Sequence, residues 1–98
     1  MTRAVAIFDE IDSTNEEARR RAAAGETGPL WILAHRQTAG RGRRGRAWDS
    51  PTGNLMTTLL VRPRVSPAEG ARLSFVAALA VSDAIAAWLP GAHAELKW

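Results

Sequence analysis

The stretch Leu30–Trp31–Ile32–Leu33–Ala34 is an unbroken apolar run that follows Pro29 and ends at His35 and Arg36. Five apolar residues are too few for a helix but have the length and character of a buried strand. The chain from Gln37 onward is therefore expected to leave the end of a strand, where binding residues are often found.

Regular elements are predicted on both sides of this strand. Their order indicates a single α/β (α+β) unit with a mixed β-sheet and packed helices, and we expect no second domain within residues 1–98. The expected elements are a strand over Ala4–Phe8, a helix over Thr14–Ala24, a strand over Leu55–Val61, a polar connection over Arg64–Gly70, a core helix over Ala71–Leu89, and the start of a further strand over Ala92–Trp98.

The first helix has a recognisable start and end. Ser13 and Glu16 have the spacing of a capping box, in which the Ser hydroxyl accepts the amide of the Glu and the Glu side chain accepts the amide of the Ser. Gly25 is placed to end the helix.

Composition excludes several classes of site. The chain has 98 residues, a formal charge of +3, and 12 arginines against one lysine. Without cysteine it has no disulfide, no thiolate zinc site and no Cys nucleophile, and with two separated histidines we expect no metal ligands. No segment has about 18 uninterrupted apolar residues, and the N-terminus has no long apolar stretch typical of a signal peptide, so we expect a cytoplasmic protein.

The segment 37–54 has no apolar periodicity and is predicted to be a long loop. Within it, Gly40–Arg46 reads GRGRRGR, which fits the letters of a dinucleotide-binding fingerprint. The residues after it do not have the character of a helix, so a Rossmann turn is not expected. Arginines between glycines suit a phosphate or carboxylate ligand, and equally a surface loop that contacts nucleic acid.

Other polar residues could join this loop in a site. Ser13, Thr14 and Asn15 stand at a helix start, where free amides can receive polar ligand groups, although capping alone also explains them. Gln37 can donate and accept hydrogen bonds at once. Trp48 is an apolar ring that could cover a ligand, and the only lysine, Lys97, is a compact cation for a carboxylate or phosphate, or a solvent-facing strand residue.

Three segments together resemble the catalytic domain of biotin protein ligases. They are Asp12–Asn15 (DSTN), Gln37–Trp48 (QTAGRGRRGRAW) and Lys97–Trp98 (KW), in the family's order and at similar separations. The family's third segment continues as K-W-P-N-D, and here only its first two letters are present. The resemblance covers nearly all of this chain but only the N-terminal part of that domain.

This resemblance implies a fold related to class II aminoacyl-tRNA synthetases and a two-step reaction. Biotin and ATP would give biotinyl-5′-AMP and pyrophosphate, and biotin would then pass to a lysine of the biotin carboxyl carrier protein of acetyl-CoA carboxylase. Mg²⁺ is expected with ATP, and its ligands are not identified. The resemblance assigns catalytic roles to Arg43 and Lys97, and contacts with biotin or its adenylate to Ser13, Thr14, Asn15, Gln37, Gly40, Arg41, Gly42, Arg43, Trp48 and Lys97.

The resemblance also sets expectations about the whole protein. Only eleven residues precede Asp12, so neither an N-terminal DNA-binding domain nor binding to DNA is expected, and no membrane partner is expected. We also expect no C-terminal domain in residues 1–98 and expect the isolated chain to be inactive. Two alternatives remain: a nucleic-acid-binding module that uses the arginine-rich loop, and a lipoate ligase, which shares the fold and the adenylation chemistry.

Overall fold

The computed structural model describes residues 4–91 and residue 95. The chain divides into two compact units, Met1–Arg62 and Pro63–Trp98. The boundary follows the third strand, where Arg62–Pro63 leads into a polar connection. Of the predicted strand over Ala92–Trp98, only residue 95 is among the described residues. Lys97 lies outside them.

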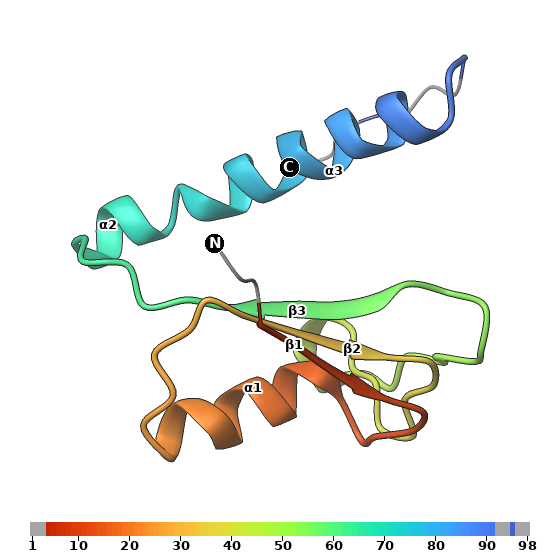
Figure 1. Ribbon diagram of the computed structural model, residues 1–98, viewed down its shortest axis with the longest axis horizontal. Coiled ribbons are helices and arrows are strands. Elements are labelled where there is room, and N and C mark those ends of the chain that lie inside the picture. Colours follow the sequence, from red (N-terminus) through yellow and green to blue (C-terminus); the bar gives the residue numbers. More distant parts are fainter. Residues whose placement is uncertain (1–3, 92–94, 96–98) are drawn as a thin grey trace. The chain divides into compact units, whose positions relative to one another are not determined.

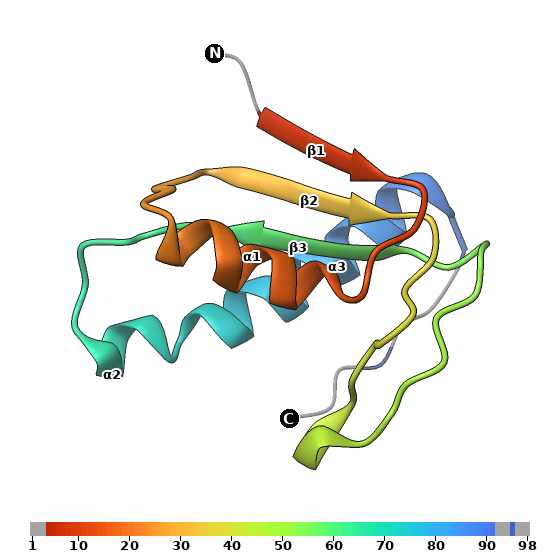
Figure 2. The same cartoon turned by 90° about the horizontal axis from the view of Figure 1, so that it is seen from below.

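The first unit contains a three-stranded mixed sheet in the order β1-β2-β3 (Figure 2). Strands β1 (Ala4–Phe8) and β2 (Leu30–Ala34) match the predicted bounds, and β3 (Met56–Leu60) is one residue shorter at each end. Strand β2 pairs parallel with β1 and antiparallel with β3, so it lies in the centre. No residue of β2 is exposed on either face of the sheet, which fits its unbroken apolar sequence.

Helix α1 (Thr14–Ala23) covers one face of this sheet (Figure 1). The core between them consists of Ala18, Leu30 and the fully buried Ile32, with Ala6 and Phe8 among the residues packed around it. In β2 every second residue is buried, because alternate side chains point to the helix-covered face. Because β1 and β2 are parallel, their carboxyl ends lie side by side. The start of α1 follows β1 in the chain, and the long loop follows β2.

The start of α1 has half of the predicted capping box. The hydroxyl of Ser13 accepts the amide of Glu16 at 3.4 Å, as expected. The carboxylate that accepts the Ser13 amide, however, belongs to Asp12 at 2.8 Å, and Glu16 instead pairs with Arg19. Asp12, which precedes the helix, accepts the Ser13 amide in place of Glu16. The Glu16 carboxylate is therefore available to pair with Arg19 on the helix surface. At the other end Gly25 has φ +98°, a conformation that favours glycine.

The second unit contains two helices within its described residues. The predicted polar connection includes a short helix, α2 (Pro67–Gly70), which Ser66 caps through the amide of Glu69. Helix α3 (Leu73–Trp88) lies within the predicted range, but none of its residues is buried, contrary to the expected core helix. The described part of this unit has no other long element to enclose it.

By length and composition alone, Pro67–Trp88 is long and apolar enough to cross a membrane. Its sequence is interrupted by the charged residues Glu69, Arg72 and Asp83, and residues 71 and 72 separate α2 from α3. A core helix of a water-soluble protein passes the same test, so the span is weak support for a membrane segment.

Candidate functional site

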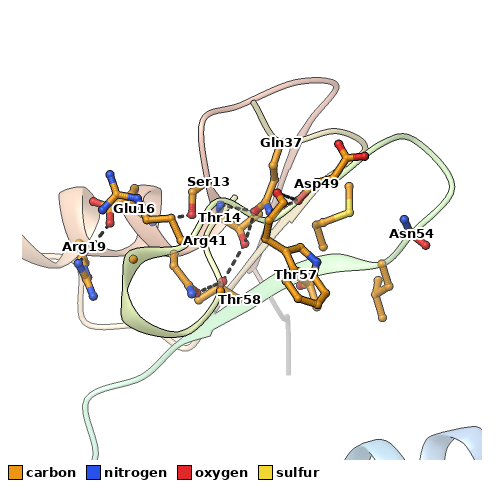
Figure 3. Close-up of a pocket in the computed structure, with 17 residues that line it drawn as sticks. Ser13, Thr14, Glu16, Arg19, Gln37, Arg41, Asp49, Asn54, Thr57 and Thr58 are labelled. Carbon is orange, nitrogen blue, oxygen red and sulfur yellow. Dashed lines mark hydrogen bonds and ion pairs between the residues drawn. The ribbon is translucent and has the colours of Figure 1, made fainter. Parts of the chain in front are cut away.

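A cavity of about 500 Å³ lies between the start of α1, the loop after β2 and the beginning of β3 (Figure 3). Its volume is within the range of pockets that hold small molecules and cofactors. All three buried polar residues in the described part of the chain, Ser13, Thr14 and Ser50, line it. The other lining residues are Asn15, Glu16, Arg19, Gln37, Arg41, Gly42, Gly45, Trp48, Asp49, Asn54, Leu55, Met56, Thr57 and Thr58.

Gln37 uses both ends of its side-chain amide within this cavity. Its Oε1 accepts the backbone amide of Thr14 at 2.8 Å and the Thr14 hydroxyl at 3.1 Å. Its Nε2 donates to Oγ of Ser50 at 3.1 Å. The amide of Thr14 is one of the free amides at a helix start, so Gln37 joins the loop to that end of α1. Gln37 thus donates and accepts at once within the protein, whereas its predicted contact with a ligand stays a prediction.

Thr58 connects β3 to the same group. Its hydroxyl lies 2.9 Å from the hydroxyl of Thr14 and donates to Oδ1 of Asn15 at 2.5 Å. A neighbouring strand thereby holds the side chain of Thr14 at the cavity wall (Figure 3). Asn15, which also lines the cavity, is held by the same hydroxyl of Thr58. Sequence reasoning missed Thr58, since a threonine in a strand is ordinary and only its pairing position brings it to α1.

The loop after β2, residues 37–50, folds as a narrow hairpin, here called the arginine hairpin. Backbone hydrogen bonds close it at several levels. Residue 37 pairs with Ile11 on one side and with Ser50 on the other. Farther out, the amide of Trp48 donates to the carbonyl of Gly40 at 2.8 Å. The predicted loop thus contains regular pairing, which the sequence hides because glycine and arginine have no strand pattern.

Gly40 is placed where no side chain fits. A Cβ atom there would lie 2.4 Å from Oγ of Ser50, 2.8 Å from the carbonyl oxygen of Trp48 and 3.0 Å from Nε2 of Gln37. The glycine therefore allows the hairpin to close against the side chains of Gln37 and Ser50.

The tip of the hairpin carries a short 3₁₀ turn, Arg43–Gly45. Arg44 and Gly45 both have positive φ, of 60° and 70°, which reverses the chain direction. In residues 4–91, Arg41, Arg43, Arg44 and Arg46 form no ion pair with any carboxylate. Four unneutralised guanidinium groups on one hairpin make it a strong attractor of anions.

The structure brings most of the predicted site residues together. Arg41 and Gly42 line the main cavity with the residues of α1, and Gly40 lies behind it against Gln37. Trp48 is 67% exposed and borders both this cavity and a second hollow at the hairpin tip. Arg43 lines only that second hollow, with Gly42, Arg44, Arg46, Ala47 and Trp48.

Below the cavity, ion pairs hold the start of α1. The guanidinium of Arg20 and the amide of Ser13 keep the pKa of the Asp12 carboxyl well below its ordinary value. Arg21, with Arg20, lowers the pKa of Glu17. These carboxylates stay charged near neutral pH and occupy Arg20 and Arg21. Arg36 is paired with Glu10. None of these three cations belongs to the hairpin, whose arginines form no ion pair in residues 4–91.

Among the described residues, no group of three or more His, Cys, Asp or Glu side chains could hold a metal ion. The cavity instead offers hydroxyls, amides and guanidinium groups, which suit a ligand with polar, neutral and anionic parts.

The chain matches a known protein family. The profile of the Biotin/lipoate A/B protein ligase family matches residues 7–98. A biotin–[acetyl-CoA-carboxylase] ligase of Paracoccus denitrificans is 51% identical over 93 residues, which are 94% of this chain and 38% of that protein. The bifunctional ligase/repressor BirA of Escherichia coli is 36% identical over 95 residues, 96% of this chain and 29% of that protein.

Solved structures agree with these sequence matches. Biotin protein ligase from Leishmania major in complex with biotinyl-5-AMP matches with a TM-score of 0.74 and 32% identity, over 99% of this chain and 40% of that one. The ligase from Aquifex aeolicus in complex with biotin and ATP gives 0.68 and 32%, over 88% of this chain and 35% of that one. The chain therefore spans well under half of these relatives, and it belongs to the biotin/lipoate A/B protein ligase family.

Proposed function

We propose that the full-length gene product is a biotin protein ligase and that the cavity beside α1 holds biotin and its adenylate. The observation that carries this proposal is that the start of α1, Gln37 and the arginine hairpin, which are far apart in the sequence, line a single cavity. The similarity to named biotin ligases supports the choice of ligand.

The chemistry of biotin fits the two parts of the cavity. Its ureido head needs donors and acceptors, which the hydroxyls of Thr14 and Thr58 and the amide of Gln37 offer. Its carboxylate must approach the α-phosphate of ATP although both are negative. The guanidinium groups of Arg41, in the cavity, and of Arg43, in the second hollow at the hairpin tip, are assigned to offset that repulsion.

The reaction proceeds in two steps in this proposal. An oxygen of the biotin carboxylate attacks the α-phosphorus of ATP, and the bond to pyrophosphate breaks. The lysine amine of a biotin carboxyl carrier protein, that of acetyl-CoA carboxylase, then attacks the acyl carbon, loses a proton and releases AMP. The hairpin and Trp48 are assigned to shield the mixed anhydride from water.

Other parts of the assignment rest on residues or partners outside the described structure. Lys97 is proposed as a second cation for the carboxylate and phosphate, and it lies outside the described residues. Mg²⁺ is expected to accompany ATP, but the described carboxylates form no metal-binding cluster, so no step is assigned to a metal ion. We place the protein in the cytoplasm.

The first test is an Arg43→Ala variant of the full-length gene product. The hairpin tip has no buried residue, so the fold is expected to survive. The yield of biotinyl-5′-AMP from biotin and ATP should fall, or the adenylate should be released faster. Wild-type rates in both half-reactions would contradict the role of Arg43.

A competition assay separates biotin from lipoate. The full-length product, ATP and equal concentrations of both acids are incubated, and the adenylate formed is identified by mass spectrometry. Biotinyl-AMP is the expected product. Formation of lipoyl-AMP alone would reassign the cavity to a lipoate ligase of the same family.

A further inference from the structure

Ser50 is the least exposed polar residue in the described part of the chain, at 3% exposed. It lies at the base of the arginine hairpin, paired with residue 37, and it lines the cavity. Neither its position nor its neighbours in the sequence mark it as functional. Its hydroxyl contacts two other groups, the side chain of Gln37 and the backbone carbonyl of Trp48. A buried hydroxyl with defined partners can determine the orientation of a neighbouring amide.

Hydrogen-bond directions at this site leave only one arrangement. The carbonyl of Trp48 can only accept, so the single proton of Ser50 is donated to it at 3.2 Å. Toward Gln37 the Ser50 oxygen must then accept, which requires the NH₂ group of Gln37 on that side. At the other end the amide N–H of Thr14 can only donate, which requires Oε1 of Gln37 there.

We propose that Ser50 is a positioning residue that fixes the side-chain amide of Gln37, so that the second Nε2 hydrogen is the group offered to the ligand. The amide of Gln37 is then a donor of fixed direction, and the cavity selects a ligand with an acceptor at that point. This inference rests on the proposed function for the identity of the ligand, whereas the link between Ser50 and Gln37 rests on geometry alone.

Gly40 supports the same arrangement from behind. A Cβ atom at this position would lie 2.4 Å from Oγ of Ser50 and 3.0 Å from Nε2 of Gln37, so the glycine leaves room for their contact. Ser50 also joins the hairpin to this contact through the Trp48 carbonyl. The orientation of Gln37 is therefore coupled to closure of the hairpin at its base.

The first experiment needs no ligand. Gln37 is the only glutamine in the chain, so labelling glutamine side chains with ¹⁵N gives one pair of Nε2 protons in the 98-residue chain. In wild type we expect nuclear Overhauser contacts to the Cβ protons of Ser50 and slow exchange with water. Ser50→Ala should raise the exchange rate about tenfold or more, the equivalent of one lost hydrogen bond. Unchanged exchange would overturn the positioning role.

The second experiment measures binding to the full-length gene product by calorimetry. Ser50→Ala should weaken biotin about tenfold and change ATP affinity by less than about twofold. Ser50→Thr keeps the hydroxyl and should restore most of the affinity. In a Gln37→Ala background, Ser50→Ala should add less than about twofold, because the two residues act as one unit.

The controls distinguish a structural effect from a positioning effect. Ser66→Ala removes another hydroxyl with a defined partner, the cap of α2, and should leave biotin affinity unchanged. Equal loss of biotin and ATP affinity in Ser50→Ala, or additive loss in the Gln37→Ala background, would overturn the proposal. If wild type binds no biotin, the proposed function fails, while the exchange measurement still decides whether Ser50 positions Gln37.

Discussion

The guanidinium of Arg20 donates two hydrogen bonds to the carboxylate of Asp12, with Nη1 2.8 Å from Oδ2 and Nη2 2.8 Å from Oδ1. The same carboxylate accepts the amide of Ser13, the residue that caps α1. Two residues eight positions apart thus hold the segment just before the start of α1, whose residues line the cavity. Such bidentate pairs have a defined geometry, unlike most surface ion pairs.

Asp12→Asn is expected to lower the free energy of unfolding in a pH-dependent way. The pKa of Asp12 is lower in the folded protein than in the unfolded chain, so the carboxylate stabilises the fold above the ordinary value of 3.8. That contribution is lost as the pH falls below this value. Urea unfolding at pH 6 and pH 2.5 should therefore show a difference between wild type and variant that shrinks in acid.

Glu10→Gln is the matched control for this experiment. Glu10 and Arg36 form an ion pair in which both side chains are more than half exposed. Its removal is expected to change stability by less than about 1 kcal/mol. An Asp12→Asn variant whose deficit is the same at both pH values would contradict the role of the charged carboxylate.

Gly40→Ala is expected to reduce biotin affinity strongly, because the new methyl group would overlap the contact between Ser50 and Gln37. Stability should also fall, by about 1–3 kcal/mol for an overpacked buried position. Gly70→Ala is the control, since a Cβ there meets only a methyl group of Val65 at 3.9 Å. Biotin affinity is measured by calorimetry. Equal affinity in the two variants would show that biotin binding does not need the space at residue 40.

Thr58→Val tests the connection between β3 and α1. The change keeps the shape of the side chain but removes the hydroxyl that contacts Thr14 and Asn15. The free energy of unfolding should fall by about 1 kcal/mol, and biotin should bind several-fold more weakly. Ser74→Ala removes a hydroxyl that bonds only within the second unit and should affect binding little. Equal affinity of Thr58→Val and wild type would remove Thr58 from the site.

Trp48 is expected to report ligand binding by fluorescence. Its ring is 67% exposed at the cavity rim and lies near Gly42. A ligand that the ring covers would exclude water and shift the emission to shorter wavelength. Trp48→Phe should abolish most of the shift seen on titration with biotin and ATP, whereas Trp88→Phe, in the second unit, should retain it. A shift that survives in Trp48→Phe would exclude contact with this ring.

Much of the first unit could be predicted because its elements have local signals. The apolar runs at Ala4–Phe8 and Leu30–Ala34 gave both strands their observed bounds, and Gly25 marked the end of α1. The second unit was predicted less well. The apolar periodicity of α3 indicated a helix but could not show whether its apolar side chains are buried, because burial depends on contacts distant in the sequence.

The candidate site divides in the same way. Gln37 and the polar start of α1 could be selected from the sequence because hydrogen-bonding residues followed a strand and a helix start. Ser50 and Thr58 could not, since isolated hydroxyl residues occur in any loop or strand. Their roles follow from the pairing of residue 37 with Ser50 and of β3 with β2.

The sequence by itself determined the strands, the start and end of α1, the charge of the hairpin and the family resemblance, because each depends on neighbouring residues or on a contiguous motif. Tertiary structure alone decided that α1, Gln37, Ser50 and Thr58 meet in one cavity and that each hydrogen bond there has a direction. The physical reason is that donors and acceptors must match across segments up to 44 residues apart, which no local pattern records.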